Sequence, residues 1–234
     1  MAEPDDDATD PKDAILDAAL PDVAFDGWSE TLLRRAAETA GVPLAEARLI
    51  FPRGGLDLAA EAHRRGDRRL AGALGDGLLD GMRIREKVTR AVRARLTIAG
   101  EWPEATRRAA ALFSLPGNVP EGMRLTWGTA DAIWNAVGDR SDDVNWYTKR
   151  LTLSGVYWST LLYWLGDESV DSEATWRFLD RRIEDVMRFE KVKGALASNP
   201  LARALTAGPR MLLSRVRAPG ERPGDLGVGY PGRP

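Results

Sequence analysis

The sequence of 234 residues contains no cysteine and a single histidine, His63. The absence of cysteine excludes disulfides, thiolate nucleophiles and cysteine-based metal sites. One histidine cannot supply a two-histidine metal site, and no serine–aspartate constellation lies near His63, so we interpret it as a surface or helix-packing residue. A chain this poor in acid–base and metal-binding groups is badly equipped for catalysis. We therefore predict no catalytic residue, no metal, no cofactor and no enzymatic activity.

Long apolar runs are also lacking. The charge-free stretch of residues 151–166 is 16 residues long, short of the roughly 20 residues needed to cross a bilayer. This stretch is better interpreted as a buried helix. The N-terminus has neither a basic segment followed by an apolar run nor an Arg-rich amphipathic presequence, which predicts a protein made and kept in a cytoplasm.

Charge of one sign is missing from each end of the chain. Residues 1–30 carry ten acidic side chains against Lys12 alone, whereas residues 191–217 carry six basic side chains and no acidic one. An acidic front suits neither DNA nor an anionic membrane, while the basic rear could suit either.

Helical periodicity dominates the rest of the sequence, punctuated by Gly and Pro, and no stretch alternates as a strand. We predict an all-α fold, with the later helices at about 56–74, 78–100, 103–114, 120–137, 144–166 and 171–197. The predicted organisation is a disordered acidic leader (1–10), a helix-turn-helix-like module (11–55), a helical bundle (56–190), a basic amphipathic helix (191–217) and a flexible Gly/Pro tail (218–234).

Residues 14–58 resemble the N-terminal module of tetracycline-repressor-type regulators, in which a short third helix enters the DNA major groove. Ser29 is the predicted N-cap of the second helix. The third helix, residues 44–50, offers one base (Arg48), one acid (Glu46) and mostly apolar side chains, which is poor chemistry for phosphates and base edges. The charge pattern favours a scaffold that does not bind DNA. A ligand-responsive transcriptional regulator of this fold is the alternative function.

Six of the seventeen aromatic residues lie in the stretch of residues 143–167. A helix that is apolar around its circumference is buried on most sides, and its mixture of large rings and small residues fits either close packing or a dry tunnel for an apolar ligand. Trp146 and Tyr147, in the first turn, form either a protein interface or a staple onto the previous helix. Ile133 and Trp134 would complete one patch with them.

The C-terminal segment has an apolar side opposite a basic side. Its predicted membrane-contact residues are Leu201, Arg203, Leu205, Arg210, Leu212 and Arg217. The pattern is typical of an interfacial amphipathic helix, although a helix docked on the domain with a solvated basic face would read the same. Pro209 would divide it into two short helices.

Two strings give a more specific resemblance. DVNWYTKR (143–150), the aromatic helix after it and DSEATWRFLDRRIEDV (171–186) together resemble the coenzyme Q biosynthesis protein nine family, over about residues 12–190. The family is described as having a tetracycline-repressor-like all-helical fold and forming dimers, which agrees with the reading of residues 14–58.

The resemblance implies an accessory protein of ubiquinone synthesis that is not an enzyme. It implies a homodimer that holds an isoprenoid or quinone intermediate in an apolar pocket and presents it at the membrane to a partner hydroxylase. By position, the implied lipid-binding residues are Leu153, Val156, Tyr157, Thr160, Leu161 and Trp164. The implied partner-binding residues are Asp131, Ile133, Trp134, Asp143, Trp146 and Tyr147.

The chain departs from the family pattern at Ala132, where animal members carry a second acid. The lack of a mitochondrial presequence predicts a bacterial member, cytoplasmic and peripherally associated with the inner membrane.

Overall fold

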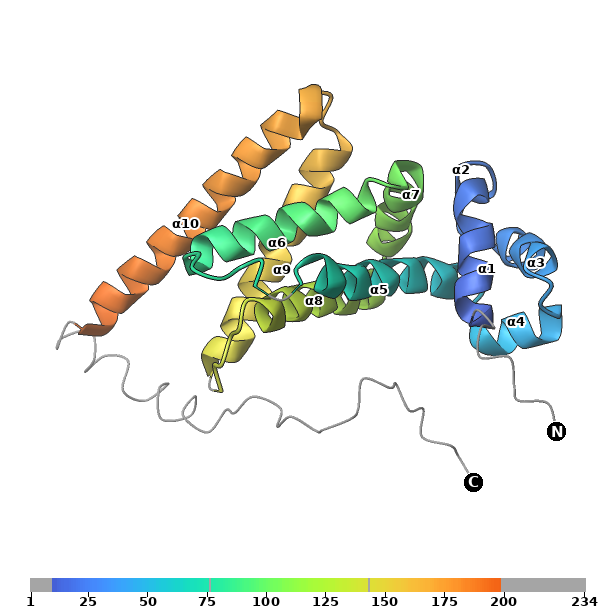
Figure 1. Cartoon of the computed structure of the whole chain (residues 1–234), viewed down its shortest axis with the longest axis horizontal. Coiled ribbons are helices and arrows are strands. Elements are labelled where there is room, and N and C mark those ends of the chain that lie inside the picture. The colour runs from blue at the N-terminus through green and yellow to red at the C-terminus, as the bar shows by residue number, and fades with distance from the viewer. Residues whose placement is uncertain (1–9, 76, 143, 199–234) are drawn as a thin grey trace.

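The computed structural model describes residues 10–75, 77–142 and 144–198, and within these ranges every regular element is a helix (Figure 1). The all-α prediction is confirmed. The predicted tail, most of the acidic leader and residues 199–217 of the basic segment lie outside the described residues.

The N-terminal module begins with a capped helix. The Asp10 carboxylate accepts a hydrogen bond from the Lys12 amide at 2.9 Å, and the Ser29 hydroxyl accepts one from the Leu32 amide at 3.1 Å, so Ser29 is the N-cap that the sequence predicts. The module comprises α1 (Pro11–Ala19), the 3-10 turn η1 (Leu20–Asp22), α2 (Val23–Asp26), α3 (Glu30–Thr39) and α4 (Leu44–Ile50). Its own small core includes the fully buried Leu16, Leu32 and Phe51.

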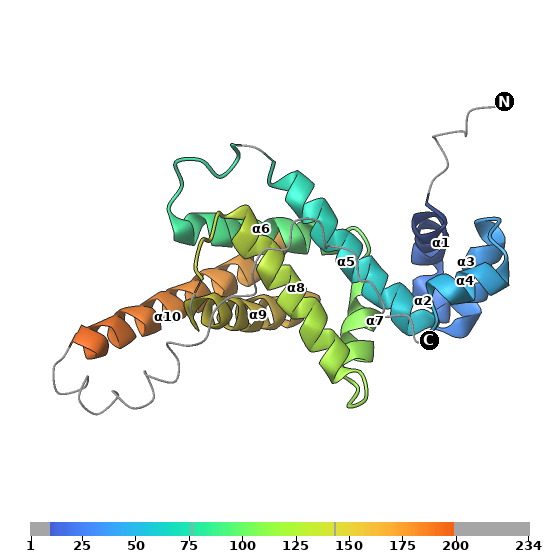
Figure 2. The same ribbon diagram turned by 90° about the horizontal axis from the view of Figure 1, so that it is seen from below.

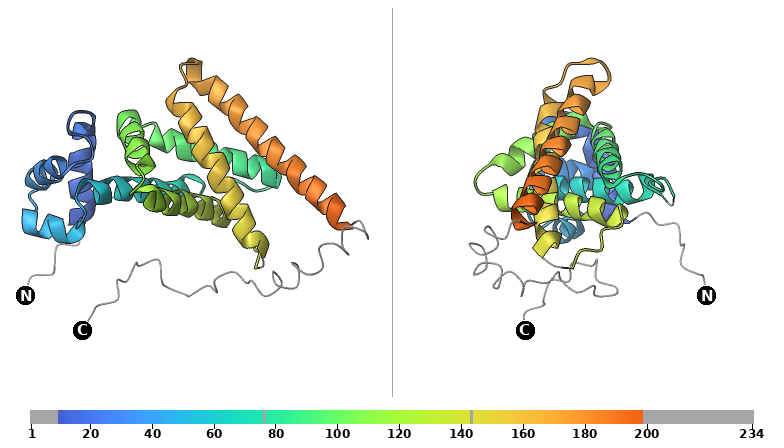
Figure 3. Two further views of the ribbon diagram at one scale, coloured as in Figure 1. Left: turned by 180° about the vertical axis from the view of Figure 1, so that it is seen from behind. Right: turned by 90° about the vertical axis from the view of Figure 1, so that its left-hand side faces the viewer.

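The remaining helices form a bundle around a second, larger core. They are α5 (Gly55–Ala73), α6 (Ile84–Ala99), α7 (Pro103–Ser114), α8 (Val119–Ala136), α9 (Val144–Leu165), the 3-10 turn η2 (Val170–Ser172) and α10 (Glu173–Ser198). Figure 2 shows α5 running from the module into the bundle, where it packs on α6 and α8. In Figure 3, α9 and α10 form a long hairpin at the far side of the bundle.

Close backbone contacts fix the module to the bundle. The Trp28 indole donates to the Ala105 carbonyl at 3.0 Å, and Arg108 donates to the Ala24 carbonyl at 2.7 Å. Gly55 lets α5 start directly against this joint, because a Cβ there would lie 2.2 Å from the Trp28 carbonyl carbon. Trp28 therefore belongs to both halves of the molecule.

The helix expected at about 78–100 starts later than predicted. Gly77 (φ 83°) and Gly81 (φ 71°) have left-handed backbones that interrupt any helix there. The Arg83 amide instead donates a hydrogen bond to the Glu86 carboxylate at 3.0 Å in a capping box. The helix α6 therefore begins at Ile84. The last helix, α10, spans Glu173–Ser198, close to the helix predicted at about 171–197, and it crosses the domain boundary that we placed at 190/191.

Candidate ligand pocket and aromatic face

A cavity of about 380 Å³ lies among α6, α8, α9 and α10. It is lined by Ile84, Val88, Trp134, Gly138, Asp139, Arg140, Asn145, Thr148, Lys149, Thr152, Leu153, Val156, Ile183, Val186 and Met187. The size falls within the range of small-molecule sites in proteins, and most of the wall is apolar.

The charged groups at one end of this cavity neutralise one another. The Lys149 ammonium donates to Asp139 Oδ1 at 2.7 Å and to the Ser141 hydroxyl at 2.6 Å, and it lies 5.2 Å from the centre of the Trp134 ring. Burial alone would raise the pKa of Asp139, but the hydrogen bonds from Lys149 and Ser141 outweigh it and hold that pKa below its usual value. The Trp134 indole donates to the Lys149 carbonyl at 3.1 Å. The polar groups of Lys149, Asp139 and Trp134 are therefore satisfied within the protein, which leaves the apolar part of the wall for a ligand.

The predicted lipid-binding residues divide between two spaces. Leu153 and Val156 line the 380 Å³ cavity, whereas Tyr157 and Leu161 line a separate pocket of about 80 Å³ on the other side of α9. Successive helical residues point about 100° apart, so one turn of α9 serves both spaces.

Thr160 and Trp164 line neither of these two pockets. The Thr160 hydroxyl donates to the Val156 carbonyl at 2.6 Å within α9, and the Trp164 ring lies against Gly100 at the end of α6. Both are packing residues. The cavity instead takes much of its wall from residues that the sequence reading missed, on α6 (Ile84, Val88) and α10 (Ile183, Val186, Met187). The spacing of Leu179, Ile183 and Val186 was the available signal.

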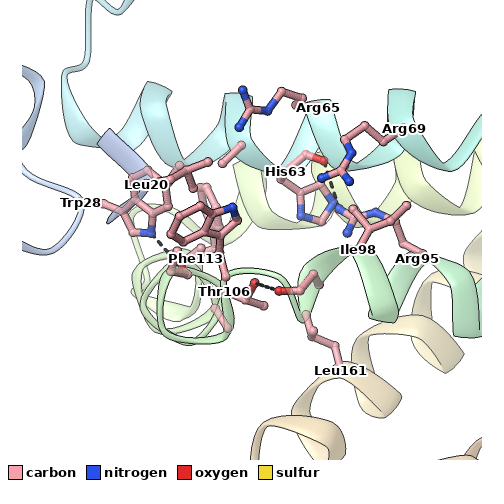
Figure 4. A pocket seen from close by; sticks show the side chains of 18 of the residues that line it. Leu20, Trp28, His63, Arg65, Arg69, Arg95, Ile98, Thr106, Phe113 and Leu161 are labelled. Carbon is pink, nitrogen blue, oxygen red and sulfur yellow. Dashed lines mark hydrogen bonds between the residues drawn. The ribbon is translucent and has the colours of Figure 1, made fainter. Parts of the chain in front are cut away.

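The smaller pocket lies where the module meets the bundle (Figure 4). His63, which we predicted to be a surface or helix-packing residue, lines it and is partly buried. Its Nε2 lies 2.8 Å from the Thr129 hydroxyl, which lies 2.8 Å from Asp67 Oδ1. The Arg95 Nε–H donates to the same Asp67 oxygen at 2.7 Å. Burial and the positive charge of Arg95 lower the pKa of His63 to about 4.

An aromatic face lies across the α8–α9 pair. The Trp127 ring centre lies 5.9 Å from that of Trp146 and 6.4 Å from that of Tyr147, and the latter two rings meet edge to face at 4.8 Å. All three are partly buried. The exposed Met123 and Leu151 follow at helical spacing, one turn from Trp127 and Tyr147 respectively. We call these five residues the α8–α9 aromatic face.

Other predicted partner-binding residues point inward. Ile133 has no exposed surface and lies in the bundle core, and Trp134 lines the cavity, so neither shares this face. Asp131 is partly exposed and accepts from Arg150. Asp143 lies outside the described residues.

Arg150 is the organising residue that the sequence reading missed. Its side chain is 2% exposed, and its guanidinium lies 3.8 Å from the centre of the Trp146 ring. It donates to Asp131 Oδ1 (2.5 Å), Asp139 Oδ2 (3.2 Å), Asn135 Oδ1 (3.2 Å) and the Trp146 carbonyl (3.3 Å). Arg150 thus ties the cavity end at Asp139 to the aromatic face at Trp146. The signal was its place on the same helical stripe as Leu153 and Tyr157.

Comparison with known proteins shows which family the chain resembles. A family model described as COQ9 matches residues 119–190. The mitochondrial ubiquinone biosynthesis proteins COQ9 of Rattus norvegicus and Homo sapiens are 34% and 32% identical to this chain over 180 residues. The chain is similar to the COQ9 family. These alignments cover 74% of this chain but 57% and 56% of the two relatives, so the chain spans little more than half their length.

The fold of this chain is that of a tetracycline-repressor-type regulator. The crystal structure of the TetR transcriptional regulator from Nitrosomonas europaea matches it with a TM-score of 0.60 and 25% identity, covering 75% of this chain and 97% of that chain. The fold prediction is confirmed.

The corresponding DNA-reading helix, α4, presents little free positive charge. Arg48 donates twice to Glu30 Oε1, at 3.0 and 2.7 Å, and Arg53 is paired with Asp57. Leu49, by contrast, is 83% exposed. Phosphate recognition needs cations that are free to reach the backbone, so this arrangement offers DNA little.

The predicted membrane-contact residues, from Leu201 to Arg217, lie outside the described residues. Of the helices that the structure describes, none combines the length and the apolar character that crossing a membrane requires.

The predicted location in a bacterial cytoplasm, at the inner membrane, is wrong. The COQ9 relatives from rat and human, and the probable ubiquinone biosynthesis protein coq9 of Dictyostelium discoideum (32% identical over 189 residues), are all named as mitochondrial. The prediction rested on the absence of a recognisable presequence. The first residues of this sequence do not determine where the protein is located.

Proposed function

We propose that this chain is a non-enzymatic accessory protein of ubiquinone biosynthesis. It holds an isoprenoid or quinone intermediate in the cavity among α6, α8, α9 and α10 and presents it, at a membrane, to a hydroxylase of that pathway. The observation that carries the proposal is a largely apolar 380 Å³ cavity in a chain whose relatives are named for ubiquinone biosynthesis.

The cavity fits part of a polyprenyl chain. About two dozen carbon atoms fill 380 Å³ if each takes roughly 15 Å³ of the enclosed space. That corresponds to about five isoprene units, each adding several buried carbons at about 0.8 kcal/mol per CH₂ before the cost of ordering is subtracted. Lys149 and Asp139, which line the cavity, are paired with each other and offer no free charge to an ionic ligand.

The position of the aromatic face supports presentation to a partner. Thr148 and Lys149 line the cavity, while Trp146 and Tyr147, in the same turn of α9, belong to the aromatic face. Aromatic residues are enriched at the energetic centres of protein interfaces. A hydroxylase bound at this face would lie within one helical turn of the cavity wall.

The ligand proposal is tested by filling the cavity. Val156→Phe adds a ring to the cavity wall, whereas Leu151→Phe makes a similar change at an exposed position of the same helix. Organic-solvent extraction and mass spectrometry should recover a polyprenyl lipid from the wild type and from Leu151→Phe, and at least about tenfold less from Val156→Phe. Wild-type protein that is reproducibly free of lipid would refute the proposal.

The partner proposal is tested at exposed positions, where folding is not at stake. Met123 is 64% and Leu151 62% exposed, so the double change Met123→Asp with Leu151→Asp alters the aromatic face without opening the core. Pull-down of the pathway hydroxylase should fall at least about tenfold, since charges unpaired at an interface cost several kcal/mol. Val170→Asp, at a residue in η2 that is 82% exposed, is the control and should bind normally. Equal binding by both proteins would exclude this face.

A further inference from the structure

The pocket of about 80 Å³ at the junction of the module and the bundle shares no lining residue with the larger cavity. It is formed by side chains from η1 and the loop after α2, together with α5, α6, α7 and α9. Figure 4 shows Leu20, Trp28 and Phe113 gathered at one end, with His63, Arg69 and Arg95 at the other. The pocket therefore has an apolar end and a cationic end.

The charged groups that line this pocket have one sign. Arg65, Arg69 and Arg95 line it, and no carboxylate does so among the described residues. Their acidic partners stand outside the lining: Arg65 pairs with Asp17 and Arg69 with Glu101. No carboxylate lines the described pocket to offset these arginines, so the wall favours an anion.

Arg95 makes this a built site and not a surface depression. It is 3% exposed, with Nε donating to Asp67 at 2.7 Å and Nη2 to the His63 carbonyl at 3.0 Å. Its Nη1 has no hydrogen-bond acceptor among the described residues. Gly66 makes room for it, because a Cβ there would lie 2.8 Å from the guanidinium carbon.

We propose that this junction pocket binds a small monocarboxylate with a short apolar group. The carboxylate faces Arg95 and Arg69, since guanidinium groups match carboxylate geometry and such hydrogen bonds are charge-assisted. The apolar group lies toward Trp28 and Phe113. A volume of about 80 Å³ admits only a few heavy atoms, which limits the ligand to the size of propionate.

The test is titration of the full-length protein with propionate, followed by NMR shifts of the Trp28 indole, at constant ionic strength. Saturable shifts with propionate and none with propionamide, its neutral isostere, are expected. Bound carboxylate should also raise the pKa of His63 from about 4, because it offsets the charge of Arg95. Equal shifts from both compounds, or no saturable shift from propionate, would overturn the proposal.

Two matched pairs of variants place the ligand. Ala109 lines the pocket and Ala111, on the same helix, is exposed, so Ala109→Leu should weaken propionate binding at least about tenfold and Ala111→Leu should not. Arg69→Gln should weaken it as well, unlike Arg90→Gln at an exposed position of α6 outside the pocket. Binding that survives Ala109→Leu would assign propionate to surface arginines and refute the pocket.

Discussion

His63 ends a buried chain of hydrogen bonds that includes Thr129, Asp67 and Arg95. The Thr129 hydroxyl has one proton, which it donates to Asp67, so it accepts from His63 Nε2–H. The imidazole is neutral near pH 7 because its pKa lies at about 4. These hydrogen bonds connect three helices: His63 and Asp67 lie on α5, Arg95 on α6 and Thr129 on α8. They therefore fix the positions of the three helices relative to one another.

Protonation of His63 should make stability depend on pH. Its pKa is about 4 in the folded protein and about 6.5 in an unfolded chain. Between these values the unfolded state binds the extra proton, so stability is full above pH 6.5 and falls as pH drops to 4, by up to about 3 kcal/mol. Urea unfolding across this range measures the slope.

His63→Gln is the matching variant, because its amide can donate to Thr129 and does not titrate. Its stability should change less between pH 6.5 and 4 than that of the wild type, and the difference reports one group, since the chain has no other histidine. Parallel pH profiles for the two proteins would contradict the buried neutral imidazole.

At the scale of helices, the approach of α5 to α6 depends on the absence of a side chain at Gly66. A Cβ at Gly66 would lie 2.8 Å from the Arg95 guanidinium, whereas a Cβ at Gly72 on the same helix meets nothing within 4 Å. Gly66→Ala should therefore destabilise the protein by about 1–3 kcal/mol through overpacking. Gly72→Ala should stabilise it by about 0.5–1 kcal/mol through helix propensity. Thermal unfolding of both variants distinguishes these outcomes. Equal changes in the unfolding temperature would show that the Arg95 side chain moves aside without cost.

Helix limits were predictable where proline or a capping side chain sets them, as at Pro103 and Ser29. The start of α6 was not predictable in this way. The apolar residues between Gly77 and Gly81 suggest a helix, but the left-handed backbones of these two glycines interrupt it. For α9, periodicity identified a helix apolar on every side. It could not assign Leu153 and Tyr157 to different pockets, since that depends on which helices lie opposite.

For the whole molecule, helical periodicity predicted the all-α class, and the pattern of residues 14–58 together with the family strings predicted the tetracycline-repressor-like fold. Neither the local pattern nor the family strings could predict the two pockets. The junction pocket combines residues from Leu20 to Leu161, and the large cavity needs α10 beside α6. Arg150 also required the structure, because a buried arginine is tolerated only where acceptors from α8 and the loop after it surround its guanidinium.

One wall of the large cavity belongs to a single helix at the end of the described chain. Ile183, Val186 and Met187 of α10 form that wall, and the described part of α10 packs mainly on α9 and α6. Tilting this one element outward would unroof a greasy tail without disturbing Arg150 or the module. The rate at which a bound lipid is transferred would then depend on how strongly α10 packs on α6 and α9, and not on the affinity of the cavity for the lipid.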